Sequence, residues 1–499
     1  MYTLGLAFII LAPISSAMFL IGTTSLYWAL IPAALLAAAG LFNLVSGNWR
    51  LRISEYRWLW PFAAFLAVAA VSLFLSPYRG QALIKGAVQL AGLTMMLLTV
   101  VTLLGLVRER KEFLVRILHG TSVVLGVVGA IALFQFFVNN LFRAEIVSFE
   151  FLQVFGGGTG WRPPGMLGAL FRANSIEGEP AHMATYLCMG AGLAFIRLGG
   201  LGETPRRSPM LQRVMPLWAA ISIFGGLATS LSIIGYLGMI VAVAATAFVW
   251  FRARRRQKKK RGRLGGKAIG AAASLLAVAL MISAFAGQSI VEKIATIGMI
   301  YDDPGNFEET GLEGTVDLVS QGGNRLSALA LAVNGQIMLE NLRARPVIGI
   351  GIGAHPASYD QNMPDYVELV PALVDMNKDD AGALLTRLLS ETGLLGTLIF
   401  LASGFWVFWT GMCATRLCAL LPGSGSDSLA PVLAGLTGSW VGIFVLYLAR
   451  LGLYYSSPFW VSICFIVILT DVAVTAVRKS PDLKFLPQGL WRRTLLYGA

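Results

Sequence analysis

The chain has 499 residues, of which 56% are hydrophobic and only 13% are charged, and its formal net charge is +13. An ordinary soluble domain carries about 25% charged residues and has far less apolar surface to bury. The composition therefore excludes a soluble globular protein and predicts an all-α polytopic membrane protein.

Apolar runs of roughly 17–25 residues, long enough to cross a bilayer as helices, recur along the chain. We predict about twelve transmembrane helices, of which the seventh and eighth are separated only by Ser232. The first lacks a basic region and a cleavage site, so we expect a retained span rather than a signal peptide. The predicted spans are Leu4–Ile21, Leu26–Val45, Trp58–Leu75, Ala82–Leu106, Ser122–Val138, Ala181–Ile196, Met215–Leu231, Ile233–Phe251, Ala268–Ala286, Ala383–Trp409, Leu429–Leu448 and Phe459–Val477.

The distribution of lysine and arginine predicts the orientation, because basic residues near helix ends are retained on the cytoplasmic side. With both termini cytoplasmic, the inner segments carry 27 of the 39 basic residues. The basic run 252–267 resembles a nucleic-acid patch, but between two spans it more simply binds anionic lipid headgroups, and we expect no nucleic-acid partner. The inner segments are Ser46–Arg57, Val107–Arg116, Arg197–Arg213, Arg252–Lys267, Gly411–Ser428 and the tail from Arg478.

This topology predicts five regions, two of which are large outer loops containing short helices. Loops of that length are usually functional. The second outer loop carries 14 acidic residues against five basic ones, so its few arginines stand out. The regions are residues 1–138 with five spans, the first outer loop 139–180, residues 181–286 with four spans, the large outer loop 287–382, and residues 383–499 with three spans and the tail.

The first outer loop combines an amphipathic beginning with a charged end. The alternation of apolar and charged residues over 142–151 predicts a helix in the headgroup plane, which either packs against lipid or guides a lipid-linked substrate. Arg162 lies in a stiff turn, Trp161–Pro164, that follows the flexible stretch Gly156–Gly160. Arg172 has no evident structural role, whereas Glu179 could cap the following helix and Glu177 lies beside it.

The second outer loop contains a predicted helix from Arg325 to about Glu340, with Leu329, Val333 and Ile337 as its apolar stripe. Arg325 in the first turn is unfavourable at a positive helix end, so we expect an anion there, either a loop carboxylate or a ligand. The glycine-rich run Gly349–Gly353 lies after Arg343 and Arg345. It predicts close backbone packing rather than a nucleotide-binding loop, since Pro356 follows on the outer side.

His355 follows the glycines. It is either a hydrogen-bonded structural residue or a base, and no cluster of zinc ligands is visible around it. Charges within the spans are few. We expect Lys85 and Arg387 to reach the interface from outer helix ends, and Arg387 to pair with Glu391 one turn later.

Four motifs together resemble the O-antigen polymerase and ligase superfamily. They are the loop ending in Arg172 and Glu179-Pro180, the Ser230-Leu231-Ser232 element with Gly235, the stretch from Arg325 to Gly353, and Leu388–Gly396. The resemblance covers roughly residues 139–400. Family ligases carry a His-Asn pair where this chain has Gly382-Ala383, and the arginine often found after the serine element is missing. The first departure favours a polymerase over a ligase.

The resemblance implies a metal-independent, inverting glycosyltransferase without cofactors in the bacterial inner membrane. It would polymerise undecaprenyl-diphosphate-linked repeat units into a surface polysaccharide; the alternatives are an O-antigen ligase and, in another class, a transporter or flippase. Its partners would be lipid-linked donor and acceptor glycans, membrane lipids, a chain-length regulator and a flippase. The expected site comprises Arg172 and Arg325 on the diphosphate, a base among Glu177, Glu179 and His355, and substrate contacts from Arg162, Arg343, Arg345 and Lys85.

Overall fold

The computed structural model describes most of the chain. The described residues are 1–12, 18–21, 24–48, 58–144, 146–147, 166–167, 170–173, 175, 180–201, 206, 208–254, 324–364, 367, 373–420, 429–450 and 452–478. The ninth predicted span, Ala268–Ala286, and most of the basic segment 252–267 lie outside these residues.

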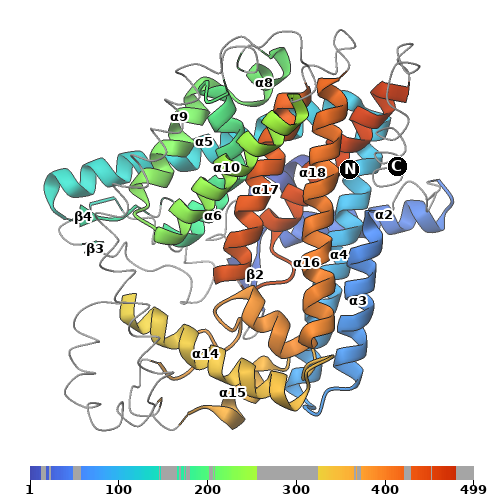
Figure 1. Cartoon of the computed structure of the whole chain (residues 1–499), viewed down its shortest axis with the longest axis vertical. Helices are drawn as coiled ribbons and strands as arrows, with labels where there is room; N and C mark the ends of the chain where they lie inside the picture. The colour runs from blue at the N-terminus through green and yellow to red at the C-terminus, as the bar shows by residue number, and fades with distance from the viewer. Residues whose placement is uncertain are drawn as a thin grey trace.

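The described part of the chain is almost entirely helical (Figure 1). The helices are α1 Tyr2–Leu11, α2 Leu30–Val45, α3 Leu59–Phe74, α4 Gln81–Glu109, α5 Lys111–Phe142, α6 Pro180–Arg197, α8 Pro209–Val214, α9 Leu217–Thr229, α10 Ile233–Arg254, α14 Asn324–Ala344, α15 His355–Asn362, α16 Leu384–Ala419, α17 Leu429–Arg450 and α18 Ser457–Arg478. Two short antiparallel hairpins, β1 Met18–Ile21 with β2 Thr24–Tyr27 and β3 Met166–Leu167 with β4 Leu170–Phe171, complete the elements.

Six of the described helices are long and apolar enough to cross a membrane, namely α4, α5, α10, α16, α17 and α18. Shorter apolar helices, among them α1, α2, α3 and α9, accompany them. The architecture is thus that of a helical membrane protein. The first span was predicted too long, since α1 ends at Leu11 and β1 follows; Ser230–Ser232 does divide α9 from α10.

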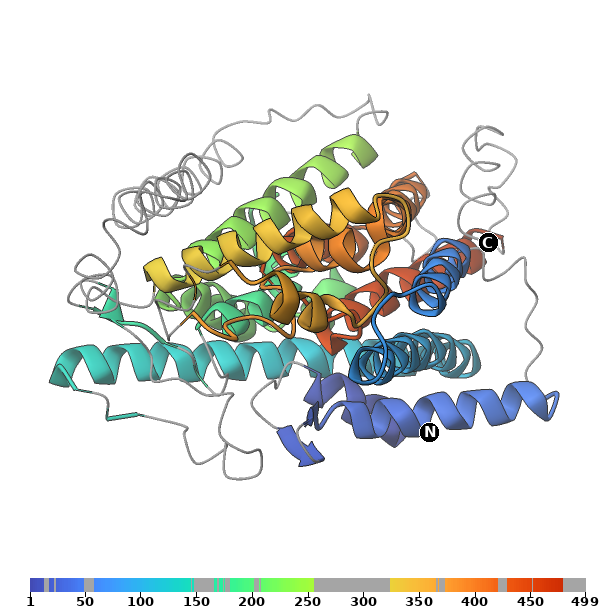
Figure 2. The same cartoon turned by 90° about the horizontal axis from the view of Figure 1, so that it is seen from below.

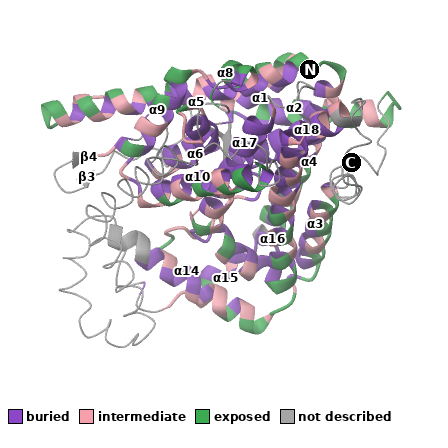
Figure 3. Ribbon diagram, turned by 45° about the horizontal axis from the view of Figure 1, so that its top comes forward, coloured by how far each residue is buried: buried purple, intermediate pink, exposed green. Residues whose placement is uncertain are grey.

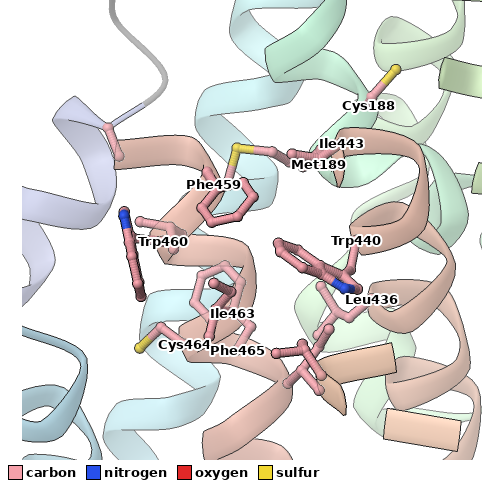
Figure 4. Close-up of a cluster of buried hydrophobic side chains, with 14 of the residues drawn as sticks. Cys188, Met189, Leu436, Trp440, Ile443, Phe459, Trp460, Ile463, Cys464 and Phe465 are labelled. Carbon is pink, nitrogen blue, oxygen red and sulfur yellow. The ribbon is translucent and has the colours of Figure 1, made fainter. Parts of the chain in front are cut away.

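Helices α6, α10, α16, α17 and α18 pack together in the centre of the molecule. Small residues allow close approach: a Cβ on Gly435 of α17 would lie 2.9 Å from the Leu193 nitrogen of α6. Because lipid tails are as apolar as the helix surfaces, the hydrophobic effect does not bring helices together in a membrane, and such close van der Waals contacts supply much of the packing energy. Figure 4 shows large side chains filling the space beside them, among them Trp440 and Phe459, whose ring centroids lie 4.9 Å apart with the rings tilted at 59°.

The two ends of the bundle are distinguished by the helices that lie there. Helices α14 and α15 lie at one end, here called the α14 face, and α8 lies at the other, the α8 face (Figures 1 and 2). At the α8 face His119 contacts the Arg213 carbonyl at 2.8 Å, and Arg108 pairs with Asp471 at 2.7 Å. These contacts involve residues of two predicted inner segments, Val107–Arg116 and Arg197–Arg213, so the predicted orientation places the α14 face outside.

Exposed residues cover the outside of α3 and the far end of α5 (Figure 3). They include large apolar side chains such as Trp60, Phe74, Phe137 and Phe142. Residue 142 belongs to the end of α5 rather than to a separate interfacial helix. An apolar outer surface is expected where helices face lipid.

Helix α16 is interrupted at Gly393, whose backbone has φ 62° and ψ −165°. The glycine-rich segment fills the break: Ile350 and Gly351 donate backbone hydrogen bonds to the Ser390 and Glu391 carbonyls, at 3.0 and 2.9 Å. Leu394 in turn donates to the Pro346 carbonyl at 2.9 Å. Close packing by this run, predicted from the sequence, is confirmed. The run also forms hydrogen bonds with backbone N–H and C=O groups that the break in the helix would otherwise leave without partners.

We predict that Gly393→Ala destabilises the protein. A Cβ there would lie 2.6 Å from the Val347 oxygen, and the backbone region is almost closed to other residues, at a cost of about 1–3 kcal/mol before any clash. The melting temperature in detergent should fall by several degrees. Gly47→Ala is the matched control, since Gly47 also has a positive φ (74°) but nothing within 4 Å. Equal shifts for the two variants would show that the break is not tightly packed.

We predict the sidedness from the basic residues. In a background without native cysteines, Val374→Cys on the α14 face should react with an impermeant maleimide in intact cells. Lys260→Cys, in the basic segment, should react only after the membrane is opened. Reaction of position 260 in intact cells would reverse the orientation.

Candidate functional site

A half-buried carboxylate, that of Asp380, lies among cationic side chains from three helices. Arg387 of α16, Arg450 of α17 and His182 of α6 all interact with it electrostatically. Its Oδ1 atom also accepts a hydrogen bond from the Gly382 nitrogen at 2.9 Å. Burial raises the pKa of the Asp380 carboxyl above its usual value, outweighing the hydrogen bond and the three cations, which act in the opposite direction.

The neighbouring Asp379 has a different environment. Its carboxylate is exposed and pairs with Lys85 of α4 at 2.8 Å. The ion pair is worth little in water, about 0–1 kcal/mol. Lys85 therefore reaches this region, as expected of a residue at an outer helix end, and it contacts a carboxylate of the same loop.

Arg172 lies beside the serine element that separates α9 from α10. Its Nε atom donates to the Ser230 carbonyl at 3.3 Å, and its charge acts on the phenol of Tyr236 in α10. The adjacent Ala173 nitrogen donates to the Thr229 carbonyl at 3.1 Å, which anchors the end of the first outer loop. The sequence element and the loop arginine, which are 58 residues apart, thus meet in space.

The Arg172 region adjoins the Asp380 region through α6 and α10. A Cβ on Gly235 would lie 2.3 Å from the Cβ of Ala184, so the first turns of the two helices are in close contact. His182 is two residues before Ala184 and interacts with Asp380. We call Arg172, His182, Asp380, Arg387 and Arg450 the cationic cluster.

Helix α14 brings its first turn toward the same part of the molecule. A Cβ on Gly382 would lie 2.9 Å from the side chain of Leu331, so α14 crosses directly beside the Asp380 turn. Figures 1 and 2 show the first turn of α14, where Arg325 lies, on the same side as the lower ends of α6 and α10. The predicted stripe of Leu329, Val333 and Ile337 is buried, which confirms the amphipathic helix.

Arg343 and Arg345 lie at the opposite end of α14. Arg343 is exposed, and Arg345 donates to the Leu75 carbonyl at 2.5 Å, in the connection between α3 and α4. Eighteen residues of helix separate Arg343 from Arg325, a distance of about 27 Å at 1.5 Å per residue. The structure does not bring these two arginines together with Arg172.

His355 is fully buried in a network of polar side chains from α14, α15 and α16. Its Nε2 atom lies 2.9 Å from Asn334 Oδ1, and its Nδ1 atom lies 3.0 Å from Ser390 Oγ. Since the Asn334 amide donates to the Ala330 carbonyl, its Oδ1 accepts, and Nε2 of the histidine carries the proton. Asn341 donates to Ser390 at 2.9 Å, leaving the serine hydroxyl to donate to Nδ1.

This network assigns His355 a structural role. Burial, together with the charge of Arg387, lowers the pKa of His355 to about 3, so the ring is neutral and weakly basic. Ser390 beside it resembles an activated nucleophile, but both side chains are enclosed and their hydrogen bonds are committed. The geometry disfavours the proposed role of His355 as the base.

Arg387 is buried rather than extended to the interface, which corrects the expectation that it snorkels. Its Nε atom lies 3.1 Å from Glu391 Oε1, confirming the predicted pair, and it donates to the Gly452 carbonyl at 2.9 Å. Tyr454 donates to Glu391 Oε2 at 3.0 Å and places its ring 5.0 Å from the guanidinium carbon. This cluster fixes the turn between α17 and α18 against α16.

Three of the expected site residues, Arg162, Glu177 and Glu179, lie outside the described residues. Four members of the cationic cluster were not among the site residues expected from the sequence, namely Asp380, His182, Arg387 and Arg450. Arg450 carried a signal, because a basic residue at the outer end of a span runs against the positive-inside distribution. Adjacent carboxylates in an acidic loop such as Asp379-Asp380 are usually solvated, which hides Asp380 in the sequence, although only Asp379 is exposed.

Comparison of the sequence with models of known protein families and with curated proteins finds no match. The cationic cluster is therefore interpreted from its own chemistry.

Proposed function

We propose that the protein is a membrane glycosyltransferase that polymerises undecaprenyl-diphosphate-linked repeat units on the outer face of the bacterial inner membrane. The observation that carries the proposal is the cationic cluster. Arg387, Arg450 and His182 act on a single half-buried carboxylate, that of Asp380, and Arg172 lies beside the adjoining start of α10, at the end of an apolar helical bundle. An anionic headgroup on a long apolar tail matches such a site.

The chemistry of the transfer fits these groups. Displacing a lipid diphosphate from a sugar places negative charge on the leaving group, and preorganised cations stabilise that charge. Arginine suits the task because its guanidinium offers a fixed fork of donors to phosphate oxygens. Arg172, with Arg325 from the first turn of α14, would hold the diphosphate, while the polyprenyl tail lies along the apolar outside of the bundle.

The arrangement of the four motifs adds support. Arg172 contacts the serine element, and the Gly349–Gly353 segment fills the break in α16 beside Glu391. These segments carry the resemblance to the polymerase and ligase superfamily, and they are brought together in pairs. If the four motifs resembled the superfamily only by chance, there would be no reason for them to lie in contact in the fold.

Reconstitution tests the proposed function directly. The purified protein in liposomes should convert lipid-linked repeat units into a ladder whose rungs differ by one repeat. Transfer of glycan only to an added lipid or protein acceptor, with no ladder, would identify a ligase. Passage of intact lipid-linked glycan across the bilayer, with no new linkage, would identify a flippase and overturn the proposal.

We predict that the transfer proceeds without a divalent metal. The arginines already supply the charge that a metal would bring to the diphosphate. Product formation should therefore persist, within about twofold, after exhaustive treatment with EDTA and removal of the chelate. Loss of activity that one particular metal restores would contradict this and would direct attention to the acidic pairs Asp302-Asp303, which lie outside the described residues, and Asp379-Asp380.

A further inference from the structure

Asp380 occupies a rigid turn immediately before α16. The residue that follows it, Ala381, is fully buried with φ 56°, a left-handed conformation that costs a residue with a Cβ about 1–2 kcal/mol. Gly382 continues the turn with φ 68° and donates its N–H to the Asp380 carboxylate. Strain of this kind persists where the surroundings impose it and is concentrated at functional sites.

The backbone around Asp380 is equally confined. A Cβ on Gly452, in the turn between α17 and α18, would overlap the Asp380 carbonyl oxygen. Gly452 is itself held by the hydrogen bond from Arg387. The carboxylate is thus fixed between α16 and α17, whereas the carboxylate of Asp379 extends into solvent.

The charges that act on Asp380 come from three of the helices packed around it. They are Arg387 from α16, Arg450 from α17 and His182 from α6. Burial still dominates and raises the pKa of the carboxyl. A carboxylate that is fixed, half-buried and more basic than usual has the properties required of a general base.

We propose that Asp380 is the general base of the transfer, an inference that rests on the proposed function. The carboxylate accepts the proton of the acceptor hydroxyl while that oxygen bonds to the anomeric carbon of the donor sugar. The bond from the anomeric carbon to the diphosphate oxygen breaks, and the polyprenyl diphosphate leaves with the electron pair. The proton then passes from Asp380 to water.

The test compares reconstituted wild-type protein with Asp380→Asn, Asp380→Ala and Asp379→Asn. Asp380→Asn should lower the rate of ladder formation at least 100-fold, while binding of radiolabelled undecaprenyl diphosphate to the purified protein in detergent, corrected for empty micelles, changes less than threefold. Asp379→Asn is the matched control and should keep the wild-type rate, because it removes only an exposed ion pair. Added formate should restore part of the activity of Asp380→Ala by replacing the missing carboxylate.

The pH dependence separates a base from a structural residue. For wild-type protein, the logarithm of the rate should fall with unit slope as the pH drops through the pKa of Asp380. His182→Gln should leave this fall in place, which shows that the neighbouring imidazole is not its source. The residual rate of Asp380→Asn should be low and should no longer decrease at low pH.

Each outcome decides between the two proposals. A wild-type rate in Asp380→Asn, with a ladder still formed, would remove Asp380 from the reaction and leave the proposed function intact. If the Asp380 variants lose activity, formate does not restore it, and the residual activity keeps the wild-type pH dependence, Asp380 is a structural residue. Absence of any sugar transfer by the wild-type protein would overturn the proposed function and the role of Asp380 with it.

Discussion

Arg172→Ala should reduce glycan transfer at least 100-fold while leaving the protein folded in the membrane. Loss of one preorganised donor at a developing charge typically costs about 10²–10³ in rate. The structural cost is smaller, since the half-buried hydrogen bond from Arg172 to the Ser230 carbonyl is worth about 1 kcal/mol. The rate is measured as ladder formation in proteoliposomes, and folding as the melting temperature in detergent.

Replacing Arg172 by lysine instead of alanine tests whether its guanidinium geometry or only its charge is needed. Arg172→Lys should fail to restore the rate, because an ammonium lacks the two-pronged geometry that fits phosphate. Arg325→Ala should lose activity to a similar degree if the first turn of α14 reaches the same diphosphate. Arg79→Ala is the control, since Arg79 is an exposed arginine in the connection between α3 and α4. Full activity in Arg172→Ala would exclude that arginine from the site.

Much of the helical architecture could be predicted from the sequence, because a membrane span must satisfy its backbone internally and must be apolar throughout. The bounds of α6, α10 and α17 lie within a few residues of the predicted spans. Sequence patterns did not predict local structure where contacts with distant parts of the chain determine it. The break in α16 depends on backbone hydrogen bonds with residues 346–351, and no pattern within Leu384–Ala419 encodes those distant partners.

The candidate site shows the same division. Periodicity identified the pairing of Arg387 with Glu391, since residues four apart share a helical face. It could not show that Arg387 is buried or that Gly452 accepts from it, because both depend on how α16 meets the turn after α17. Asp380 and Asp379 are neighbours of identical type, and only the fold distinguishes the half-buried carboxylate from the exposed one.

The buried Arg387–Glu391 pair should make single substitutions there strongly destabilising. Both side chains are almost inaccessible, at 2% and 0% exposure. Removing one partner leaves an uncompensated buried charge, at a cost of about 3–5 kcal/mol. Glu391→Ala should therefore lower the melting temperature sharply and reduce the amount of protein in the membrane. Tyr454, which donates to Glu391, would lose its hydrogen-bond acceptor as well.

The double variant Arg387→Met/Glu391→Leu should be more stable than Glu391→Ala, because replacing a whole buried pair by apolar groups avoids the uncompensated charge. Asp471→Ala provides the comparison: its pair with Arg108 is partly exposed and should be worth about 0–1 kcal/mol. The double variant should nevertheless transfer little glycan, since Arg387 also faces Asp380 and holds Gly452. If Glu391→Ala and Asp471→Ala melt at the same temperature, the Arg387–Glu391 pair is not the buried anchor described above.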